Sequence, residues 1–179
     1  ADQHYHRLRE RLDQYAVGFP VSESGTEMAI LKKLFSPEEA ELFLCLQPKP
    51  EPVETIVHRT DLNRPQLKRM LERMVDKGLI YRREKDNGVQ FAALPFAPGI
   101  FEQQSATMDE TLAKLFDTYF EEVFHKNFTD TSPVLIHRSI PIHRSIDIAY
   151  PMPMYEHSRE IVRDQDLIAV TPCICRVQK

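Results

Sequence analysis

The chain has 179 residues, of which 42% are hydrophobic, and a formal net charge of −4 at pH 7. This length suits one large domain or two small ones, and the net acidity argues against nucleic-acid binding over the whole surface. No apolar run approaches the roughly 18–20 residues of a membrane helix, and the polar N-terminus is neither a signal peptide nor a transit sequence. We therefore expect a cytoplasmic protein that does not contact a membrane.

The first 50 residues predict three helices. Apolar residues at spacings of three and four predict an amphipathic helix over residues 4–16. Ser24 followed by Glu27 predicts a capping box that begins a second helix. Ser36, with Glu39 three residues later, predicts a second capping box at the start of a third. Three prolines, Pro48, Pro50 and Pro52, then form a stiff connector.

Residues 53–94 are the best-defined stretch. A short helix is followed by a turn at Thr60–Asp61 and a longer helix over about residues 65–77, capped by Asn63. Two strands follow around the Asp-Asn-Gly turn at residues 86–88. A helix, a turn, a second helix and a hairpin in this order predict a winged helix-turn-helix. The predicted fold class is α+β, with a mainly helical winged helix-turn-helix domain over residues 1–98 and a smaller α/β segment over residues 99–179.

The second half is expected to begin with a long helix. Thr107 and Glu110 predict its capping box, and its broad apolar face over residues 109–127 must pack against the first helix or a second subunit. The second alternative predicts a homodimer through the helices at residues 4–16 and 109–127. Alternating residues 134–149 predict one or two strands, followed by a short helix near residues 155–164 and a buried strand at Leu167–Val170.

The winged helix is the first candidate site, because residues 51–90 carry nine basic and seven acidic side chains and form the only net basic third of the chain. DNA binding requires cations that neutralise phosphates and a helix that enters the major groove. The interspersed acidic residues equally favour a module that packs or contacts protein. The candidate nucleic-acid-binding residues are Arg64, Lys68, Arg69, Arg73, Arg82, Arg83 and Lys85.

The second candidate site is Cys173 with Cys175. Thiolates bind soft metals and iron–sulfur clusters, but two of them do not complete a four-cysteine cluster site. The alternative is a pair of incidental thiols near the end of the sequence. Cys45, the third cysteine, lies in an apolar run and is expected to be a small buried hydrophobic residue. An odd number of cysteines does not describe a disulfide framework.

The sequence gives less support for histidine metal sites and for nucleotide or hydrolytic chemistry. His137 and His143 are considered as metal ligands, but they lack the spacing of a known histidine motif and are better explained as solvent-facing strand residues. Nucleotide-binding glycine motifs and a nucleophile elbow are absent. We find no catalytic constellation, so whether the protein is an enzyme stays uncertain, with an electron carrier or accessory subunit favoured over a catalyst.

Three segments resemble landmarks of one protein family. They are GFPVSESGTEMAILKKLFSPEEAEL (Gly18–Leu42), LPFAPGIFE (Leu94–Glu102) and CICRVQK (Cys173–Lys179). Together, and in this order, they resemble a bacterial family that pairs an N-terminal winged-helix region with a C-terminal [4Fe–4S] ferredoxin-like region. The resemblance extends over nearly the whole chain.

The resemblance implies that Cys173 and Cys175 are ligands of a [4Fe–4S] cluster and that more cysteines follow in family members. The chain is then expected to be a truncated part of a longer protein, one that holds no complete cluster itself. The implied function is electron transfer with a redox partner protein. The alternative is a winged-helix DNA-binding transcriptional regulator that senses redox state, and a third is a scaffold for protein interaction.

Overall fold

The computed structural model describes residues 2–85, 88–124 and 155–178. It is a mainly helical α+β structure, and the chain divides into two compact units, residues 1–136 with 173–179 and residues 137–172. The predicted strands within residues 134–149 lie outside the described residues, as do His137 and His143. The predicted boundary at residue 98 stays a prediction.

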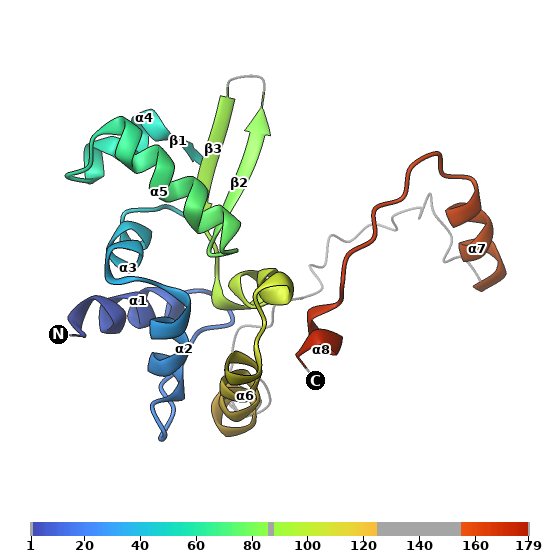
Figure 1. Cartoon of the computed structure of the whole chain (residues 1–179), viewed down its shortest axis with the longest axis horizontal. Coiled ribbons are helices and arrows are strands. Elements are labelled where there is room, and N and C mark those ends of the chain that lie inside the picture. Colours follow the sequence, from blue (N-terminus) through green and yellow to red (C-terminus); the bar gives the residue numbers. More distant parts are fainter. Residues whose placement is uncertain (1, 86–87, 125–154, 179) are drawn as a thin grey trace, which may run out of the picture. The chain divides into compact units, whose positions relative to one another are not determined.

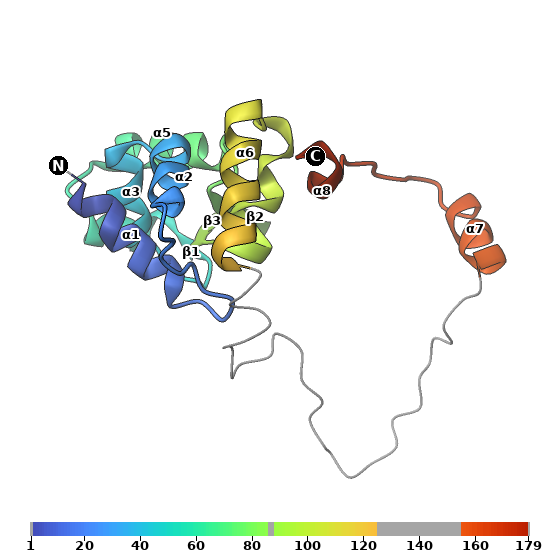
Figure 2. The same cartoon turned by 90° about the horizontal axis from the view of Figure 1, so that it is seen from below.

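Three helices begin the larger unit: α1 (Gln3–Asp13), α2 (Thr26–Leu34) and α3 (Pro37–Leu44). Helix α1 contacts both α2 and α3, and α2 also contacts α6 (Glu110–Tyr119) (Figure 2). The predicted capping box of α3 is confirmed, because the backbone N–H groups and side chains of Ser36 and Glu39 pair reciprocally. Pro37 occupies the first helical position, where no backbone donor is needed.

Two other predicted capping boxes are wrong. Helix α2 begins after Gly25, whose positive φ of 72° sets the entry to the helix, and Glu27 accepts hydrogen bonds from Ser22 instead of reaching back to Ser24. Helix α6 is capped by Asp109, whose Oδ1 lies 2.7 Å from the backbone nitrogen of Leu112. At α6 the Asp109 carboxylate meets a backbone donor of the first turn, and at α2 the backbone N–H of Thr26 donates to the Ser22 hydroxyl in place of a Ser24 cap.

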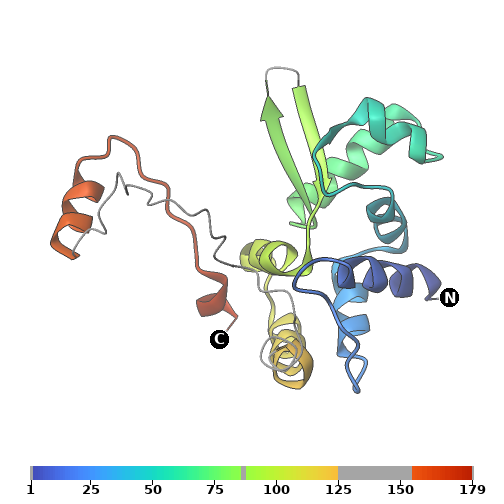
Figure 3. The ribbon, with the colours of Figure 1, turned by 180° about the vertical axis from the view of Figure 1, so that it is seen from behind.

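The middle of the chain contains β1 (Glu51–Pro52), α4 (Val53–Ile56), η1 (Val57–Arg59) and α5 (Arg64–Asp76). The strands β2 (Ile80–Lys85) and β3 (Gly88–Ala93) form an antiparallel hairpin in a sheet of order β1-β3-β2. The hairpin lies beside α5 when seen from either side (Figures 1 and 3). The predicted second helix and hairpin are therefore confirmed.

An aromatic cluster closes the core between the N-terminal helices and α6. The rings of Phe19 and Phe96 have centroids 4.2 Å apart, and those of Phe19 and Tyr119 lie 4.9 Å apart. Phe101 and Phe116 meet edge to face at 4.9 Å. Two short segments, η2 (Phe96–Ile100) and η3 (Glu102–Ala106), carry the chain into α6, which continues as η4 (Phe120–Phe124).

The broad apolar face of α6 is buried inside the chain, because Leu112, Phe116 and Tyr119 all belong to the core. The alternative that this face packs against the first helix is wrong, because the main helical partner of α6 is α2. These buried faces supply no argument for a homodimer, which stays a prediction.

The described part of the second unit contains α7 (Tyr155–Arg163), which confirms the predicted short helix. The prediction of a buried strand at Leu167–Val170 is wrong. Those residues form no strand, and Leu167 and Val170 are 90% and 92% exposed. The chain then re-enters the larger unit at Cys173 and forms α8 (Ile174–Val177). Within the described residues, no helix is long and apolar enough to cross a membrane.

Candidate nucleic-acid interface and candidate metal centre

Helix α5 is the best-specified element of the candidate interface. Asn63 and Gln66 form a capping box at its start, and Leu67, Leu71 and Met74 are buried on one side. Gly78 ends the helix with a φ of 68°. The backbone N–H of Gly78 donates to Val75 and that of Leu79 to Met74, the two bonds of a Schellman motif.

Most of the predicted DNA-binding cations already have partners. Arg64 pairs with Glu54 of α4. The Nε of Arg82 lies 3.5 Å from a carboxylate oxygen of Glu72, so this pair joins the hairpin to α5. Exposed pairs of this kind contribute little to stability, so phosphates would compete with them readily. The two remaining paired residues are Arg73, which binds Glu39, and Arg83, whose Nε donates to Gln90 at 2.9 Å.

Arg73 binds a carboxylate that is almost inaccessible to solvent. The Glu39 side chain is 2% exposed, and its oxygens accept from Arg73 Nε at 3.0 Å and from Lys77 Nζ at 2.5 Å. Burial raises the pKa of Glu39, but the hydrogen bonds from Lys77 and Ser36 and the charges of Lys77 and Arg73 outweigh it, so the pKa lies below its ordinary value. Arg73 therefore joins α5 to α3 and is poorly placed to leave for a phosphate.

Three predicted cations, Lys68, Arg69 and Lys85, have no ion-pair partner among the described residues. They do not share one face. Successive side chains of a strand point to opposite sides, and Arg82 points toward α5, so Arg83 and Lys85 lie on the side of the hairpin away from α5. Lys68 and Arg69 on α5 therefore lie on a different surface from Arg83 and Lys85 on the hairpin.

A notch of about 320 Å³ opens where α5 meets β1 and β3. Its lining includes the apolar residues Pro52, Val53 and Phe91, and also Lys68 and the Arg64–Glu54 pair. Lys68 is the cation of this notch that no acidic side chain neutralises in the described structure. An anionic group such as a phosphate or carboxylate would find one free positive charge here.

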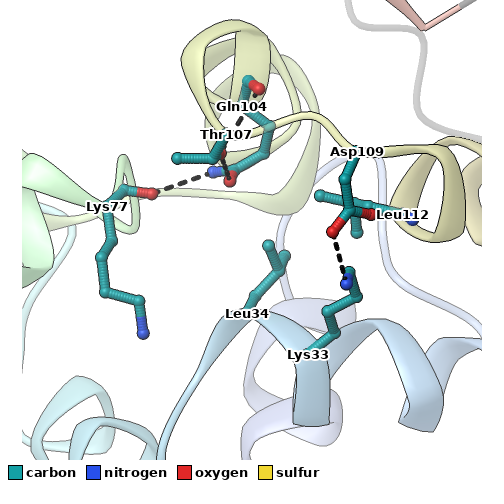
Figure 4. A pocket seen from close by; sticks show the side chains of 7 residues that line it. All are labelled: Lys33, Leu34, Lys77, Gln104, Thr107, Asp109 and Leu112. Atoms are coloured by element: carbon teal, nitrogen blue, oxygen red, sulfur yellow. Dashed lines mark hydrogen bonds and ion pairs between the residues drawn. The ribbon is translucent and has the colours of Figure 1, made fainter.

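A smaller hollow of about 160 Å³ lies between α2 and η3 (Figure 4). Lys33 Nζ lies 2.7 Å from Asp109 Oδ2, and this hydrogen bond, with that from the Leu112 backbone, lowers the pKa of Asp109. Gln104, only 1% exposed, donates from Nε2 to the carbonyl oxygens of Lys77 and Ile100. Because ligand sites are usually about 300 Å³ or larger, this hollow is better explained as structural.

The sequence did not indicate the roles of Gln104 or Glu39 as long-range anchors. Glu39 was recognised only as part of a capping box, and its second role requires Arg73 and Lys77, more than thirty positions away. Gln104 satisfies carbonyl groups at the end of α5, which a linear pattern does not locate.

The two cysteines of the candidate metal centre lie at the start of α8. Cys173 is the N-cap residue of this helix, and both Cys173 and Cys175 are exposed. Ile174 between them is 6% exposed and belongs to the core, and Gln178 Nε2 donates to the Asp117 carboxylate of α6. The pair is thus attached to the larger unit with its thiols accessible.

Cys45 differs from this pair. It was expected to be buried, but it is half-buried at the C-terminal end of α3, where its thiol donates to the Glu41 carbonyl oxygen at 3.6 Å. Burial raises the pKa of the Cys45 thiol. It is therefore less suited than the exposed pair to metal binding, which requires the thiolate.

The donor type of Cys173 and Cys175 fits a thiolate-bound cluster, but the number of donors does not complete one. In the part of the chain that the structure describes, no three metal-binding side chains come together. Comparison with protein-family models, with curated proteins and with solved structures gives no match to this chain.

Proposed function

We propose that the chain is the N-terminal part of a cytoplasmic iron–sulfur protein that transfers electrons to or from a redox partner protein, with Cys173 and Cys175 as two ligands of a [4Fe–4S] cluster. The observation that carries this proposal is the placement of the two thiols. They are exposed on a helix that Ile174 and Gln178 attach to the core, which holds two soft ligands outward at a fixed place. The cluster would supply the redox chemistry, and the protein would bind and position it.

The proposal requires ligands beyond this pair. A [4Fe–4S] cluster is held by four thiolates, and Cys45 is the one other cysteine in the sequence. Cys45 is half-buried and hydrogen-bonded within α3. The remaining ligands would therefore come from residues outside this sequence. The family resemblance of the CICRVQK segment supports the same assignment.

The test is to purify the protein anaerobically at its full natural length and to measure iron, acid-labile sulfide and visible absorption. We expect stoichiometric iron and sulfide, which fall sharply in Cys173→Ser and Cys175→Ser. Cys45→Ser is the matched control and should retain both. A colourless full-length protein without iron would exclude the proposal, as would equal iron content in all three variants.

A second candidate function is DNA binding by a winged helix-turn-helix over α3 to β3. The observation that favours it is the order of elements: helix, short strand, helix, helix and hairpin, with the sheet order β1-β3-β2. Arg69 lies exposed on α5, the helix that would enter the major groove. The mixed charge supports this function less well, because at least three of the seven predicted cations are already paired with carboxylates.

DNA binding is tested separately from iron binding by measuring duplex retardation at low salt. Binding through phosphate contacts predicts an affinity that falls steeply as salt rises. The absence of retardation for mixed-sequence duplexes at low salt would remove this candidate and leave the iron–sulfur proposal untouched.

A further inference from the structure

The face of the β2–β3 hairpin that points away from α5 carries one aromatic ring and two cations in a single row. Arg82 reaches Glu72 of α5. Because side chains alternate along a strand, the row on the opposite face consists of Tyr81, Arg83 and Lys85, which we call the hairpin row. Neighbours in this row lie about 7 Å apart along the strand. Among the described residues β2 is an edge strand, and the hairpin projects beyond α5 (Figures 1 and 3).

The two cations of the hairpin row are not neutralised among the described residues. Arg83 Nε donates to Oε1 of Gln90 at 2.9 Å, which holds the guanidinium in place and leaves its two terminal nitrogens without an ion pair in that part of the chain. Lys85 is exposed, and it lies opposite Gly88, which has no side chain to cover it. The described β3 positions on this face are Gly88, Gln90 and Ala92, none of them acidic. Both positive charges are therefore available to a ligand.

The aromatic ring of the hairpin row is open to solvent as well. Tyr81 is 45% exposed and lies opposite Ala92, whose methyl group covers little of a tyrosine ring. Within the described residues, Tyr81 is the one aromatic side chain among the exposed large hydrophobic residues. An accessible ring offers a stacking surface to a base, and unpaired cations offer partners to phosphates.

We propose that the hairpin row binds single-stranded nucleic acid, with a base stacked on Tyr81 and phosphates at Arg83 and Lys85. This surface differs from the face of α5 that would enter the major groove of a duplex. It is also independent of the proposed iron–sulfur function, since no residue of the row lies near the two exposed thiols in the sequence.

The ring favours a single strand over the other anionic polymers. In a duplex the faces of the bases are stacked on one another, so a duplex would gain from the two cations but not from Tyr81. An acidic peptide pairs with cations in the same way and presents no base. A single strand supplies both the phosphates and an accessible base, which is the chemistry that the hairpin row can recognise.

The test is the fluorescence anisotropy of labelled single strands of mixed sequence, about 12 nucleotides long, titrated with the unsubstituted chain at low salt. One strand is DNA and the other is RNA of the same sequence, and binding of either supports the proposal. Tyr81→Ala should weaken binding about tenfold because stacking is lost, whereas Tyr81→Phe keeps the ring and should bind like the unsubstituted chain.

The cations are tested through the salt dependence. Arg83→Gln and Lys85→Gln should each reduce the slope of log affinity against log salt by about 0.7, the contribution of one phosphate of a single strand. Lys49→Gln is the matched control, because Lys49 is an exposed lysine that precedes β1, the strand at the other edge of the sheet. It should leave both the affinity and the slope unchanged, and circular dichroism checks that every variant keeps its fold.

Three results would overturn the proposal. The first is that neither strand binds at low salt, and the second is that Tyr81→Ala binds as tightly as Tyr81→Phe. The third is that a duplex or polyglutamate competes as well as the unlabelled single strand, which would show a surface that recognises charge without recognising bases. None of these results bears on the iron content of the protein, so the iron–sulfur proposal is judged separately.

Discussion

Arg73 Nε lies 3.0 Å from Oε1 of Glu39, a side chain that is 2% exposed. Arg73 is one of the predicted DNA-binding cations, and in the structure it joins α5 to α3. Substituting a residue in such a bond is expected to lower the free energy of unfolding, whether or not the residue also contacts DNA.

Glu39→Gln should lower the free energy of unfolding by about 1–3 kcal/mol at neutral pH, because two cations lose their charged acceptor. Urea denaturation followed by circular dichroism measures the change. Glu41→Gln is the control, because its ion pair with Arg7 is about half exposed and should contribute little. Equal losses in the two variants would contradict the role assigned to Glu39.

The same pair predicts a pH dependence. Because the folded-state pKa of Glu39 is lowered from its ordinary value of 4.5, its contribution to stability is present above pH 4.5 and is lost as the pH falls through the folded-state pKa. The difference in the free energy of unfolding between the unsubstituted protein and Glu39→Gln should therefore shrink as the pH is lowered from neutral. Denaturation curves recorded at several pH values measure this difference. A constant difference over the whole range would be inconsistent with this linkage.

Gly78→Ala should be strongly destabilising. A Cβ at this position would lie 2.6 Å from Cβ of Gln103, and the φ of 68° is unfavourable for alanine. Gly25→Ala is a close control, because its φ is 72° but a Cβ there meets no atom within 4 Å. We expect about 1–2 kcal/mol from the backbone conformation in both variants and a further ~1–3 kcal/mol from overpacking at Gly78 alone. Equal denaturation midpoints for Gly78→Ala and Gly25→Ala would show that Gln103 moves away from the added Cβ at no measurable cost.

Arg69→Ala and Arg73→Ala should separate binding from folding. If α5 contacts DNA, Arg69→Ala reduces the slope of log affinity against log salt by about one, with unchanged stability. Arg73→Ala should instead lower the unfolding midpoint, because it removes a partner of Glu39. Retardation titrations at several salt concentrations, paired with denaturation curves, measure both effects. A lowered midpoint for Arg69→Ala would contradict its placement as a free surface cation.

The three thiols should differ in reactivity. Cys173 and Cys175 are exposed, whereas Cys45 is half-buried with a raised thiol pKa, so iodoacetamide should modify the pair first in the metal-free protein. Mass spectrometry of peptides over time measures the three rates. In denaturant the rates should become similar, which controls for local sequence effects. Rapid modification of Cys45 in the folded protein would show that the C-terminal end of α3 opens readily.

Local patterns in the sequence predicted the elements that depend on neighbouring residues. The capping box at Ser36, the cap at Asn63 and the hairpin all formed as expected, because each is satisfied within a few positions. Ser24 and Thr107 carried the same signals but failed, since Gly25 and Asp109 were better placed to begin the helices. Local spacing identifies candidates for a cap but does not choose between adjacent ones.

The failures at longer range have a different cause. Leu167–Val170 has the composition of a buried strand, but among the described residues the sheet consists of β1, β2 and β3, and this segment pairs with none of them. Likewise, the sequence located the seven cations but did not reveal which acidic side chains would lie against them. Pairing depends on the fold, so the composition of a basic helix overstates the charge available to a ligand.

The position of β2 at the edge of the sheet has a consequence for solubility. An edge strand presents unpaired backbone groups on which another chain can add a strand, and charged side chains on such a strand discourage this. Arg82, Arg83, Glu84 and Lys85 occupy four consecutive positions of β2. Their presence is explained by protection against edge-to-edge aggregation, whether or not a nucleic acid ever meets the hairpin.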